Sequence, residues 1–471
     1  MALREKFGTG ILSLATVIAV FTGSVYSAVY IKERITSTED TGDPLFLTEY
    51  IESGEIQKAR DLSKTGYLPN ASSILSYSGF ITVSKEFNSN IFFWFFPAMN
   101  GDKKAPVLLW LQGGPGASGL FGFFVENGPY TLDANMTATI RDYHWAKNCQ
   151  IIFVDNPVGT GFSFTDHPKG YVTNQEEMAD DMYEFLQQFF TLFYEYRNNE
   201  FYITGESYAG KYIPSLAYKI HSVGPSSKIN LTGMAIGNGM CDPETMMDYG
   251  TYLYNIGLVD EMQAAEMKNL SLSIVNHIRE EDFYEALIEM EKLIINFNVL
   301  PYKSLFQIFT GMNFYYNFLM SDTPKDFAYL MDYIELPQFR KALHIGNLTF
   351  QNGSMAQKNL LMDIMKSVKS KVAVLMDNYR VMFYNGQLDI IIPYPLTLNF
   401  LKSVDWKYAN EYKKAKRLIW KLNDTKQIAG YVHNVGDFYE VLVRNAGHIL
   451  PYDQPKVALD LISRFVKRIP F

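Results

Sequence analysis

The chain has 471 residues, of which 48% are hydrophobic, enough for one large core with an inserted region or for two smaller domains. Its formal net charge is −8 and it has no dense block of Lys and Arg, which argues against nucleic acid and acidic membrane surfaces as partners. Two cysteines, Cys149 and Cys241, are too few for a disulfide scaffold. They could form one bridge in an oxidising compartment, or both could be buried thiols.

The N-terminus has the pattern of a secretory signal. Basic residues precede an uncharged, largely apolar stretch over residues 7–31, and the small side chains of Ser27 and Ala28 fit a cleavage site. We predict a signal peptide over residues 1–28. The same stretch is long enough to span a bilayer, so a retained signal anchor is the alternative. If the signal is cleaved, we expect no stable membrane partner, because no comparable apolar run follows.

Sequons for N-glycosylation agree with a secretory route. Seven Asn-x-Ser/Thr sequons occur, and we expect several of them to carry glycans on the surface. They lie at Asn70, Asn135, Asn230, Asn269, Asn347, Asn352 and Asn423.

A polar lead-in over residues 29–74, helical or irregular and a candidate propeptide, is followed by strand-like segments. Apolar runs at residues 79–83 and 90–98 predict a hairpin. Later runs are short, apolar and bounded by Gly or Pro, as expected for strands buried on both faces of a largely parallel sheet. These runs span residues 105–114, 149–157 and 200–207. Residues 174–196 place apolar side chains on one face after an acidic first turn, which predicts a helix.

The alternation of strands and helices stops at about residue 243, and the chain is helical by pattern as far as residue 332. Strand-like runs then resume, at residues 372–377, 379–389 and 438–448. Alternating strands and helices predict an α/β fold with a mostly parallel central sheet, and the helical block is best explained as a cap inserted over that sheet. We therefore predict three parts: a first core part (75–242), a helical cap (243–335) and a second core part (336–471).

The stretch "ITGESYAGKYIP" places Ser207 between a strand and a helix. Gly-x-Ser-x-Gly in that context is the pattern of a nucleophile elbow, in which small neighbours let the strand and the helix approach closely. Here Ala209 replaces the last glycine, so the general pattern is met only loosely. Alone, the stretch is also compatible with a polar turn residue.

The order of the downstream residues strengthens the prediction of a nucleophile. A serine hydroxyl needs a base to take its proton and a third group to orient that base. Asp389 ends one strand-like run and His448 ends another, and an α/β-hydrolase triad follows the order Ser, Asp, His. We predict Ser207, Asp389 and His448 as the catalytic residues.

Acyl transfer also needs hydrogen-bond donors for the oxyanion. The backbone N–H of Tyr208, directly after the predicted nucleophile, is one candidate. The second should come from a glycine-rich loop after an early strand. The stretch "WLQGGPGAS" lies at that place, and we predict Gly114 as the donor.

Six separated motifs, in order, resemble those of the serine carboxypeptidases, and most of all their vitellogenic carboxypeptidase-like branch. They are "WLQGGPGAS", "VENGPY", "DNPVGTGFSF", "ITGESYAGKYIP", "YNGQLDIIIP" and "RNAGHILPYDQP". The resemblance covers about residues 75–470. It implies an α/β-hydrolase fold with a helical insertion, a secreted or lysosomal location and removal of C-terminal residues from peptides. Members of the family are often dimers, so a homodimer is expected.

The resemblance also implies which residues bind the free carboxylate of the substrate. Gln112, Glu126 and Glu206 align with the family's carboxylate-binding residues, and Trp110 lies beside them. Two glutamates can bind a carboxylate when they share a proton, because two close carboxyls do not both ionise readily. Binding of peptides with a free C-terminus should therefore be favoured at acid pH.

This sequence departs from many members of the family at two positions. Gln112 stands where many have asparagine, and we expect this longer amide to change how the carboxylate is bound. Ala117 stands where many have a cysteine bridged to the insertion, so the cap lacks that tie to the core. Neither departure affects the predicted triad.

Two other functions remain open from the sequence. One is an esterase or acyltransferase on the same scaffold, and the other is a non-catalytic partner that protects lumenal hydrolases. Loss of a triad residue would have favoured the second, and none is lost. We expect neither a metal ion nor a cofactor.

Overall fold

The computed structural model of the chain describes residues 39–69, 71–294 and 299–471. The predicted signal over residues 1–28 and the sequon at Asn70 lie outside the described residues. Among the helices that are described, none is both long enough and apolar enough to cross a membrane.

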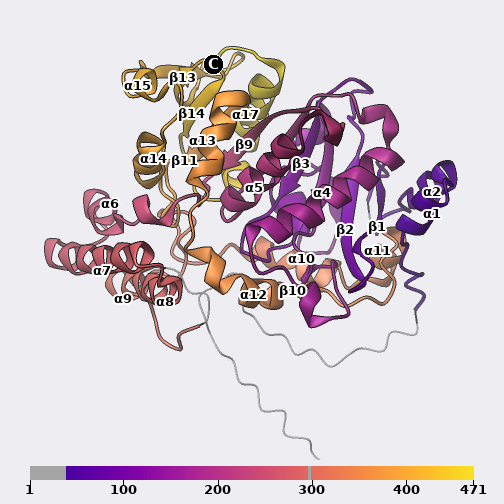
Figure 1. Cartoon of the computed structure of the whole chain (residues 1–471), viewed down its shortest axis with the longest axis horizontal. Helices are drawn as coiled ribbons and strands as arrows, with labels where there is room; N and C mark the ends of the chain where they lie inside the picture. The colour runs from indigo at the N-terminus through magenta and orange to yellow at the C-terminus, as the bar shows by residue number, and fades with distance from the viewer. Residues whose placement is uncertain (1–38, 70, 295–298) are drawn as a thin grey trace, which may run out of the picture.

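A ten-stranded sheet has the order β1-β2-β6-β3-β8-β9-β11-β14-β13-β12 (Figure 1). The six neighbouring strands from β6 to β14 are parallel, and the two strands at each edge pair antiparallel. The strands are β1 (Tyr77–Ser84), β2 (Ser89–Phe96), β3 (Val107–Leu111), β6 (Gln150–Val154), β8 (Phe201–Glu206), β9 (Leu231–Gly237), β11 (Arg380–Gly386), β12 (Leu418–Lys421), β13 (Ile428–Val435) and β14 (Phe438–Val443). The prediction of an α/β fold with a mostly parallel central sheet is confirmed.

The central strands are buried because helices cover both faces of the sheet. Successive side chains of a strand point to opposite faces. In β3, Leu109 therefore packs into one hydrophobic cluster and Leu108 into the other. The first cluster includes Phe185 from α4, and the second includes Phe465 from α17. Strands that are apolar on both faces follow from this arrangement.

The helices of the two core parts flank the sheet (Figure 1). They are α3 (Gly119–Phe121), α4 (Gln175–Leu192), α5 (Ala209–Val223), α11 (Pro337–Ala342), α12 (Ser354–Ile364), α13 (Lys369–Asn378), α14 (Tyr394–Ser403), α15 (Ala409–Tyr412), α16 (Leu450–Asp453) and α17 (Pro455–Lys467). The lead-in before the core contains α1 (Thr48–Glu52) and α2 (Ile56–Ser63). Short pairs of strands lie outside the sheet: β4 (Tyr130–Leu132) with β5 (Ala138–Ile140), and β7 (Thr160–Gly161) with β10 (Gln351–Asn352).

The segment predicted as a cap forms helices between β9 and β11. They are α6 (Tyr249–Asn255), α7 (Glu261–Arg279), α8 (Phe283–Leu293), α9 (Leu305–Thr310) and α10 (Tyr329–Tyr333). Figure 1 shows α6 to α9 grouped at one side of the molecule, beyond the sheet. The exact limits of the cap, residues 243 and 335, stay a prediction.

One predicted strand is wrong. Residues 372–377 belong to the helix α13. Val372, Leu375 and Met376 are buried, whereas the residues between them are partly exposed. This spacing of three and four residues is that of one helix face. A short apolar run does not by itself distinguish such a face from a strand.

The two cysteines are both free and buried. Burial raises the pKa of the Cys149 thiol to about 12 and that of the Cys241 thiol well above its usual range. Of the two alternatives left open by the sequence, the structure therefore has buried thiols.

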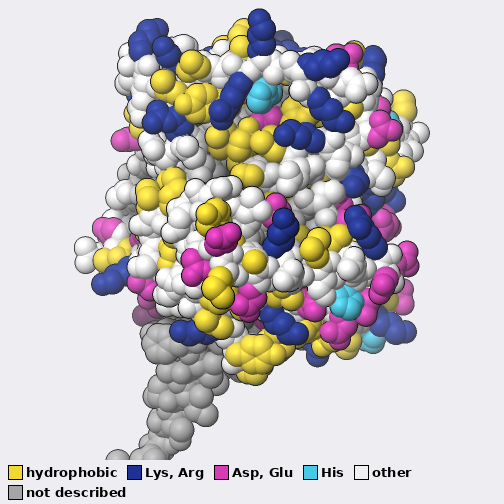
Figure 2. Space-filling view, turned by 90° about the vertical axis from the view of Figure 1, so that its left-hand side faces the viewer, with side chains coloured by type: hydrophobic (Ala, Val, Ile, Leu, Met, Phe, Trp, Pro, Cys, Tyr) yellow, Lys and Arg dark blue, Asp and Glu magenta, His cyan; other side chains and the backbone are white. Residues whose placement is uncertain are grey.

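Charged side chains are unevenly spread over the face seen in Figure 2. Lys and Arg predominate at its upper end, and Asp and Glu are more frequent in its lower half. All five cations of residues 413–421 are exposed. Although the net charge of the chain is −8, this end of the surface is therefore locally basic.

Candidate active site

Ser207 lies on a sharp turn between β8 and α5, the context predicted for a nucleophile elbow. Its φ of +62° is in the left-handed region, which residues other than glycine rarely adopt. Its N–H donates to the Gly237 carbonyl at 3.0 Å, and its carbonyl accepts from the N–H of Gly210 at 2.9 Å and of Met240 at 3.0 Å. Surrounding bonds thus hold a strained backbone, a feature that clusters at functional sites.

The small residues around the elbow allow close backbone approaches. A Cβ on Gly205 would lie 2.1 Å from the Leu111 carbonyl oxygen, and one on Gly210 would lie 2.6 Å from the Met240 nitrogen. A Cβ on residue 205 would also lie only 3.1 Å from the Cβ of Ala209. Because residue 205 is glycine, the Ala209 side chain has room. Ala209 therefore replaces the last glycine of the elbow pattern without blocking the turn.

Asp389 and His448 come together at the carboxyl ends of β11 and β14. The Nδ1 atom of His448 lies 2.8 Å from Oδ2 of Asp389, and both side chains are buried. The carboxylate accepts a hydrogen bond from the Nδ1–H group of the imidazole. Nε2 then carries no proton and is the acceptor that a general base needs. In the described part of the chain Nε2 has no hydrogen-bond partner, so a bond to Ser207 is not formed in this structure. In enzymes without substrate such bonds are often long or poorly aligned.

Asn238 is a supporting residue that the sequence reasoning missed. Its Nδ2 donates to Oδ2 of Asp389 at 2.5 Å, and its Oδ1 accepts from the N–H of Gly386 at 3.2 Å. The N–H groups of Ile391 and Ile392 donate to the other oxygen of Asp389. The available signal was the turn Gly-Asn-Gly after the apolar run at β9. Together these donors hold the carboxylate of Asp389 in one orientation.

The two predicted oxyanion donors lie on adjoining loops. A Cβ on Gly113 would lie 2.7 Å from the Tyr208 nitrogen, so the loop before Gly114 packs directly against the elbow. Gly114 has a φ of +111°, which only glycine adopts readily. In the described chain neither N–H donates a turn or loop hydrogen bond, so both are available to an oxyanion.

A buried aspartate fixes the end of the Gly114 loop. Asp155 accepts from the Ser118 hydroxyl at 2.5 Å and from the N–H groups of Gly119 at 2.9 Å and Phe162 at 2.7 Å. Burial raises the pKa of Asp155 to about 6, and the hydrogen bonds oppose that shift. The loop is thereby tied to the end of β6.

The predicted carboxylate-binding residues form one buried chain of hydrogen bonds. Trp110 Nε1 donates to Gln112 Oε1 at 2.8 Å, and Gln112 Nε2 donates to Glu206 Oε1 at 2.8 Å. The indole N–H is only a donor, so it fixes which end of the Gln112 amide faces Glu206. Gly122 leaves room for this chain, since a Cβ there would lie 2.1 Å from Trp110 Nε1.

Glu126 lies next to Glu206, and both carboxyls are buried. Burial raises the pKa of Glu126 to about 7. Burial and then the neighbouring charge of Glu126 raise the pKa of Glu206 well above its ordinary value. In the described structure, Oε2 of Glu206 and both oxygens of Glu126 have no hydrogen-bond partner. The pair thus retains a proton at acid pH and has free polar atoms for a ligand.

Arg141, which the sequence reasoning missed, supports the turn that carries Glu126. That turn is a π-helix, η1 (Gly122–Asn127), a form frequent at functional sites. The guanidinium donates to the carbonyls of Phe124 and, at 3.1 Å, Gly128. Its charge also counteracts the rise in the pKa of Glu126.

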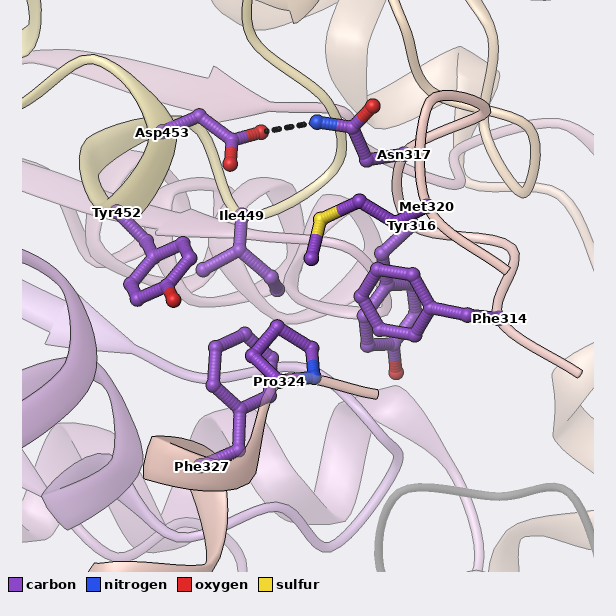
Figure 3. Close-up of a pocket in the computed structure, with 9 residues that line it drawn as sticks. All are labelled: Phe314, Tyr316, Asn317, Met320, Pro324, Phe327, Ile449, Tyr452 and Asp453. Carbon is purple, nitrogen blue, oxygen red and sulfur yellow. Dashed lines mark hydrogen bonds between the residues drawn. The ribbon is translucent and has the colours of Figure 1, made fainter. Parts of the chain in front are cut away.

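A pocket next to His448 is open between the cap and α16 (Figure 3). The Tyr316 ring stacks on the imidazole at 4.8 Å, and Ile449 follows His448 directly. Most of its lining is apolar, and Asp453 and Asn317 lie together at one end, joined by a hydrogen bond of 3.0 Å. The lining residues are Phe314, Tyr316, Asn317, Met320, Pro324, Phe327, Ile449, Tyr452 and Asp453.

The fold is that of the α/β-hydrolases. The crystal structure of a prohormone-processing carboxypeptidase from Saccharomyces cerevisiae superposes with a TM-score of 0.72 at 21% identity, covering 87% of this chain and 96% of that one. The parallel sheet, the elbow after β8 and the Asp389–His448 pair after β11 and β14 agree with this class.

A model of the serine carboxypeptidase family matches residues 68–468. The probable serine carboxypeptidase CPVL of Homo sapiens is 47% identical over 94% of this chain and 93% of its own length. The venom serine carboxypeptidase of Apis mellifera is 44% identical over 93% of this chain and 95% of its own. The vitellogenic carboxypeptidase of Aedes aegypti is 42% identical over 91% of each. The chain therefore belongs to the serine carboxypeptidase family, and its substrates are peptides.

Proposed function

We propose that Ser207 attacks the last peptide bond of a substrate. His448 Nε2 takes the hydroxyl proton as the bond from Oγ to the carbonyl carbon forms, and it then gives that proton to the leaving amine. Asp389 holds the imidazole and stabilises its charged form. The N–H groups of Gly114 and Tyr208 stabilise the oxyanion. Water then attacks the acyl-enzyme, with His448 acting as base again. The 2.8 Å contact between His448 and Asp389 at the ends of two strands is the observation that carries this proposal.

We propose that Gln112, Glu126 and Glu206 bind the free carboxylate of the peptide, with Trp110 orienting the amide of Gln112. The raised pKa values of the two glutamates support this role, because a protonated carboxyl donates a hydrogen bond to a carboxylate. The oxygens of Glu126 that lack a partner would receive one when substrate binds. Peptide cleavage should therefore be favoured at acid pH.

A direct assay tests this function. The full-length protein is incubated, from about pH 4 to about pH 7, with blocked dipeptides that have a free C-terminus and with amidated controls. We expect release of the C-terminal residue from the acids, at least tenfold faster than from the amides at about pH 5. If the C-terminal residue is released from neither kind of substrate, the proposal is contradicted. Equally fast release from the acids and from the amides would favour an esterase or amidase on this scaffold.

We also propose that the pocket of Figure 3 receives the side chain of the C-terminal residue. The pocket borders His448, and the charge of Asp453 at its end helps raise the pKa of Glu126, so it lies beside both parts of the site. Its aromatic and aliphatic lining favours an apolar side chain.

Shortening Phe327 tests the pocket. In Phe327→Ala, kcat/KM for a substrate ending in Phe should fall about tenfold, because part of the apolar wall is lost. A substrate with the same acyl part ending in Ala should be unaffected, since its side chain does not reach the wall. The two kcat/KM values are compared in wild type and variant, and an equal fall for both substrates would contradict this assignment.

We propose that the protein follows the secretory pathway to a secreted or lysosomal location. Six of the predicted glycosylation sites have exposed side chains, which supports this route: Asn135, Asn230, Asn269, Asn347, Asn352 and Asn423. One of the relatives is a venom protein. The homodimer expected from the family resemblance stays a prediction.

A further inference from the structure

A segment of the predicted cap, residues 315–318, runs between the loop of Asp389 and the loop of His448. We call it the strap. The carbonyl of Tyr315 accepts from the N–H groups of Ile390 and Ile391, each at 3.2 Å. The N–H of Phe318 donates to the Leu388 carbonyl at 2.9 Å. The strap thus bonds to the residues on both sides of Asp389.

The same strap bonds to the His448 loop. The carbonyl of Tyr316 accepts from the His448 N–H at 2.6 Å, and Nδ2 of Asn317 donates to Asp453 at 3.0 Å. That Asp453 oxygen also accepts from the N–H of Gly447 at 2.6 Å. A Cβ on Gly447 would lie 2.0 Å from the Tyr316 carbonyl oxygen, so only glycine permits this approach.

The ring of Tyr316 lies over the imidazole of His448. The ring centroids are 4.8 Å apart and the planes are 22° from parallel. This contact restricts rotation of the imidazole. It also places an aromatic face against the positive charge that His448 acquires when it takes the Ser207 proton.

Helix α6 of the predicted cap holds the Asp389 loop from another side. The buried hydroxyl of Tyr252 donates to the Asp389 carbonyl at 2.7 Å. The buried hydroxyl of Tyr249 donates to the Ile391 carbonyl, also at 2.7 Å. Two separate segments of the insertion therefore bond to the backbone that carries the catalytic carboxylate.

From these contacts we infer that Tyr252 and Tyr316 are positioning residues for the Asp389–His448 pair. The inference depends on the proposed function, in which that pair activates Ser207. The insertion then helps to align the Asp389 carboxylate with the His448 imidazole, in addition to covering the sheet. The two loops also bond directly, from the Leu388 N–H to the Ala446 carbonyl at 2.8 Å, so the experiment must show that this bond alone does not suffice.

Two matched substitutions test the inference in the full chain. Tyr252→Phe removes only the hydroxyl bonded to Asp389. Tyr333→Phe is the control, because the buried hydroxyl of Tyr333 donates to a backbone carbonyl, that of Pro69, at 2.8 Å, but not to either loop. We expect Tm to fall by a similar amount in both variants. In Tyr252→Phe, kcat should be about tenfold lower with KM unchanged, whereas the control Tyr333→Phe should keep wild-type kinetics.

The rate at which a small phosphonylating reagent labels Ser207 gives a second readout, because it depends on the activated serine and not on peptide binding. It should fall by the same factor as kcat in Tyr252→Phe and in Tyr316→Leu. Unchanged rates in both variants, or an equal loss in Tyr333→Phe, would overturn the inference. If Tyr252→Phe does not fold, Tyr249→Phe takes its place with the same expected result. A wild-type protein that neither cleaves peptides nor is labelled would instead refute the proposed function.

Discussion

Replacing Ser207 with alanine should lower kcat by about 10⁴-fold or more while leaving the fold intact. The hydroxyl is the only part of the site that forms a covalent bond with substrate in the proposed mechanism. Without it His448 has no nucleophile to activate, and the oxyanion donors contribute only to residual catalysis. Alanine also keeps a Cβ and removes no hydrogen bond of the backbone turn.

The measurement is release of the C-terminal residue, together with labelling by a serine-directed phosphonylating reagent. Ser222→Ala is the matched control, because Ser222 lies on the same helix α5 and its hydroxyl donates within that helix, to the Tyr218 carbonyl at 2.8 Å. Wild type and control should be labelled at Ser207 alone. Near-normal turnover in Ser207→Ala, or labelling of another serine, would show that the nucleophile lies elsewhere.

Much of the central sheet could be predicted because buried parallel strands leave a local signal. The runs around β3, β6 and β8 are short, apolar and ended by Gly or Pro. The strands β9, β12 and β13 were not predicted, and residues 372–377 were assigned to a strand although they are helical. Such runs are too short for their periodicity to decide between a strand and one helix face.

The residues that support the site could not be predicted, because long-range contacts define their roles. Asn238 is close to Asp389 only after β9 and β11 have paired in parallel. Arg141 donates to the turn of Glu126 only once β4 and β5 have formed a hairpin. The strap has no distinctive pattern of its own, and its backbone bonds join segments at least 70 residues apart in the sequence. Ser207, Asp389 and His448 differ in that each follows a strand in a known order.

The glutamate pair should make KM for peptides depend strongly on pH. The pKa of Glu126 is about 7 and that of Glu206 lies well above its ordinary value, so the pair holds a proton throughout the acid range. When the Glu126 carboxyl loses its proton, near pH 7, the pair carries a negative charge that repels the carboxylate of the substrate. We expect KM to be constant at acid pH and to rise about tenfold for each pH unit above about 7, reaching about 100-fold at pH 9.

The same pair should affect stability. Burial raises the pKa of Glu126 from 4.5 to about 7, so the folded protein binds more protons than the unfolded chain between these values. The contribution of this difference to the free energy of unfolding is fully present below about pH 4.5 and is lost as pH rises toward about 7. Asp155 titrates in the same window, with a pKa of about 6, so only the difference from a variant isolates the pair.

That variant is Glu126→Gln with Glu206→Gln, in which an amide replaces each carboxyl and has no proton to lose. KM for the free acid should then be nearly independent of pH, and the decrease in Tm from about pH 4.5 to about pH 7 should be smaller than in wild type. The measurements are KM and kcat against pH for a substrate acid and its matched amide, and Tm against pH. The amide, which presents no carboxylate, should give flat KM profiles in both proteins. Identical profiles for acid and amide in the wild type would contradict the role of the glutamates, because recognition of the C-terminus would then not depend on their proton.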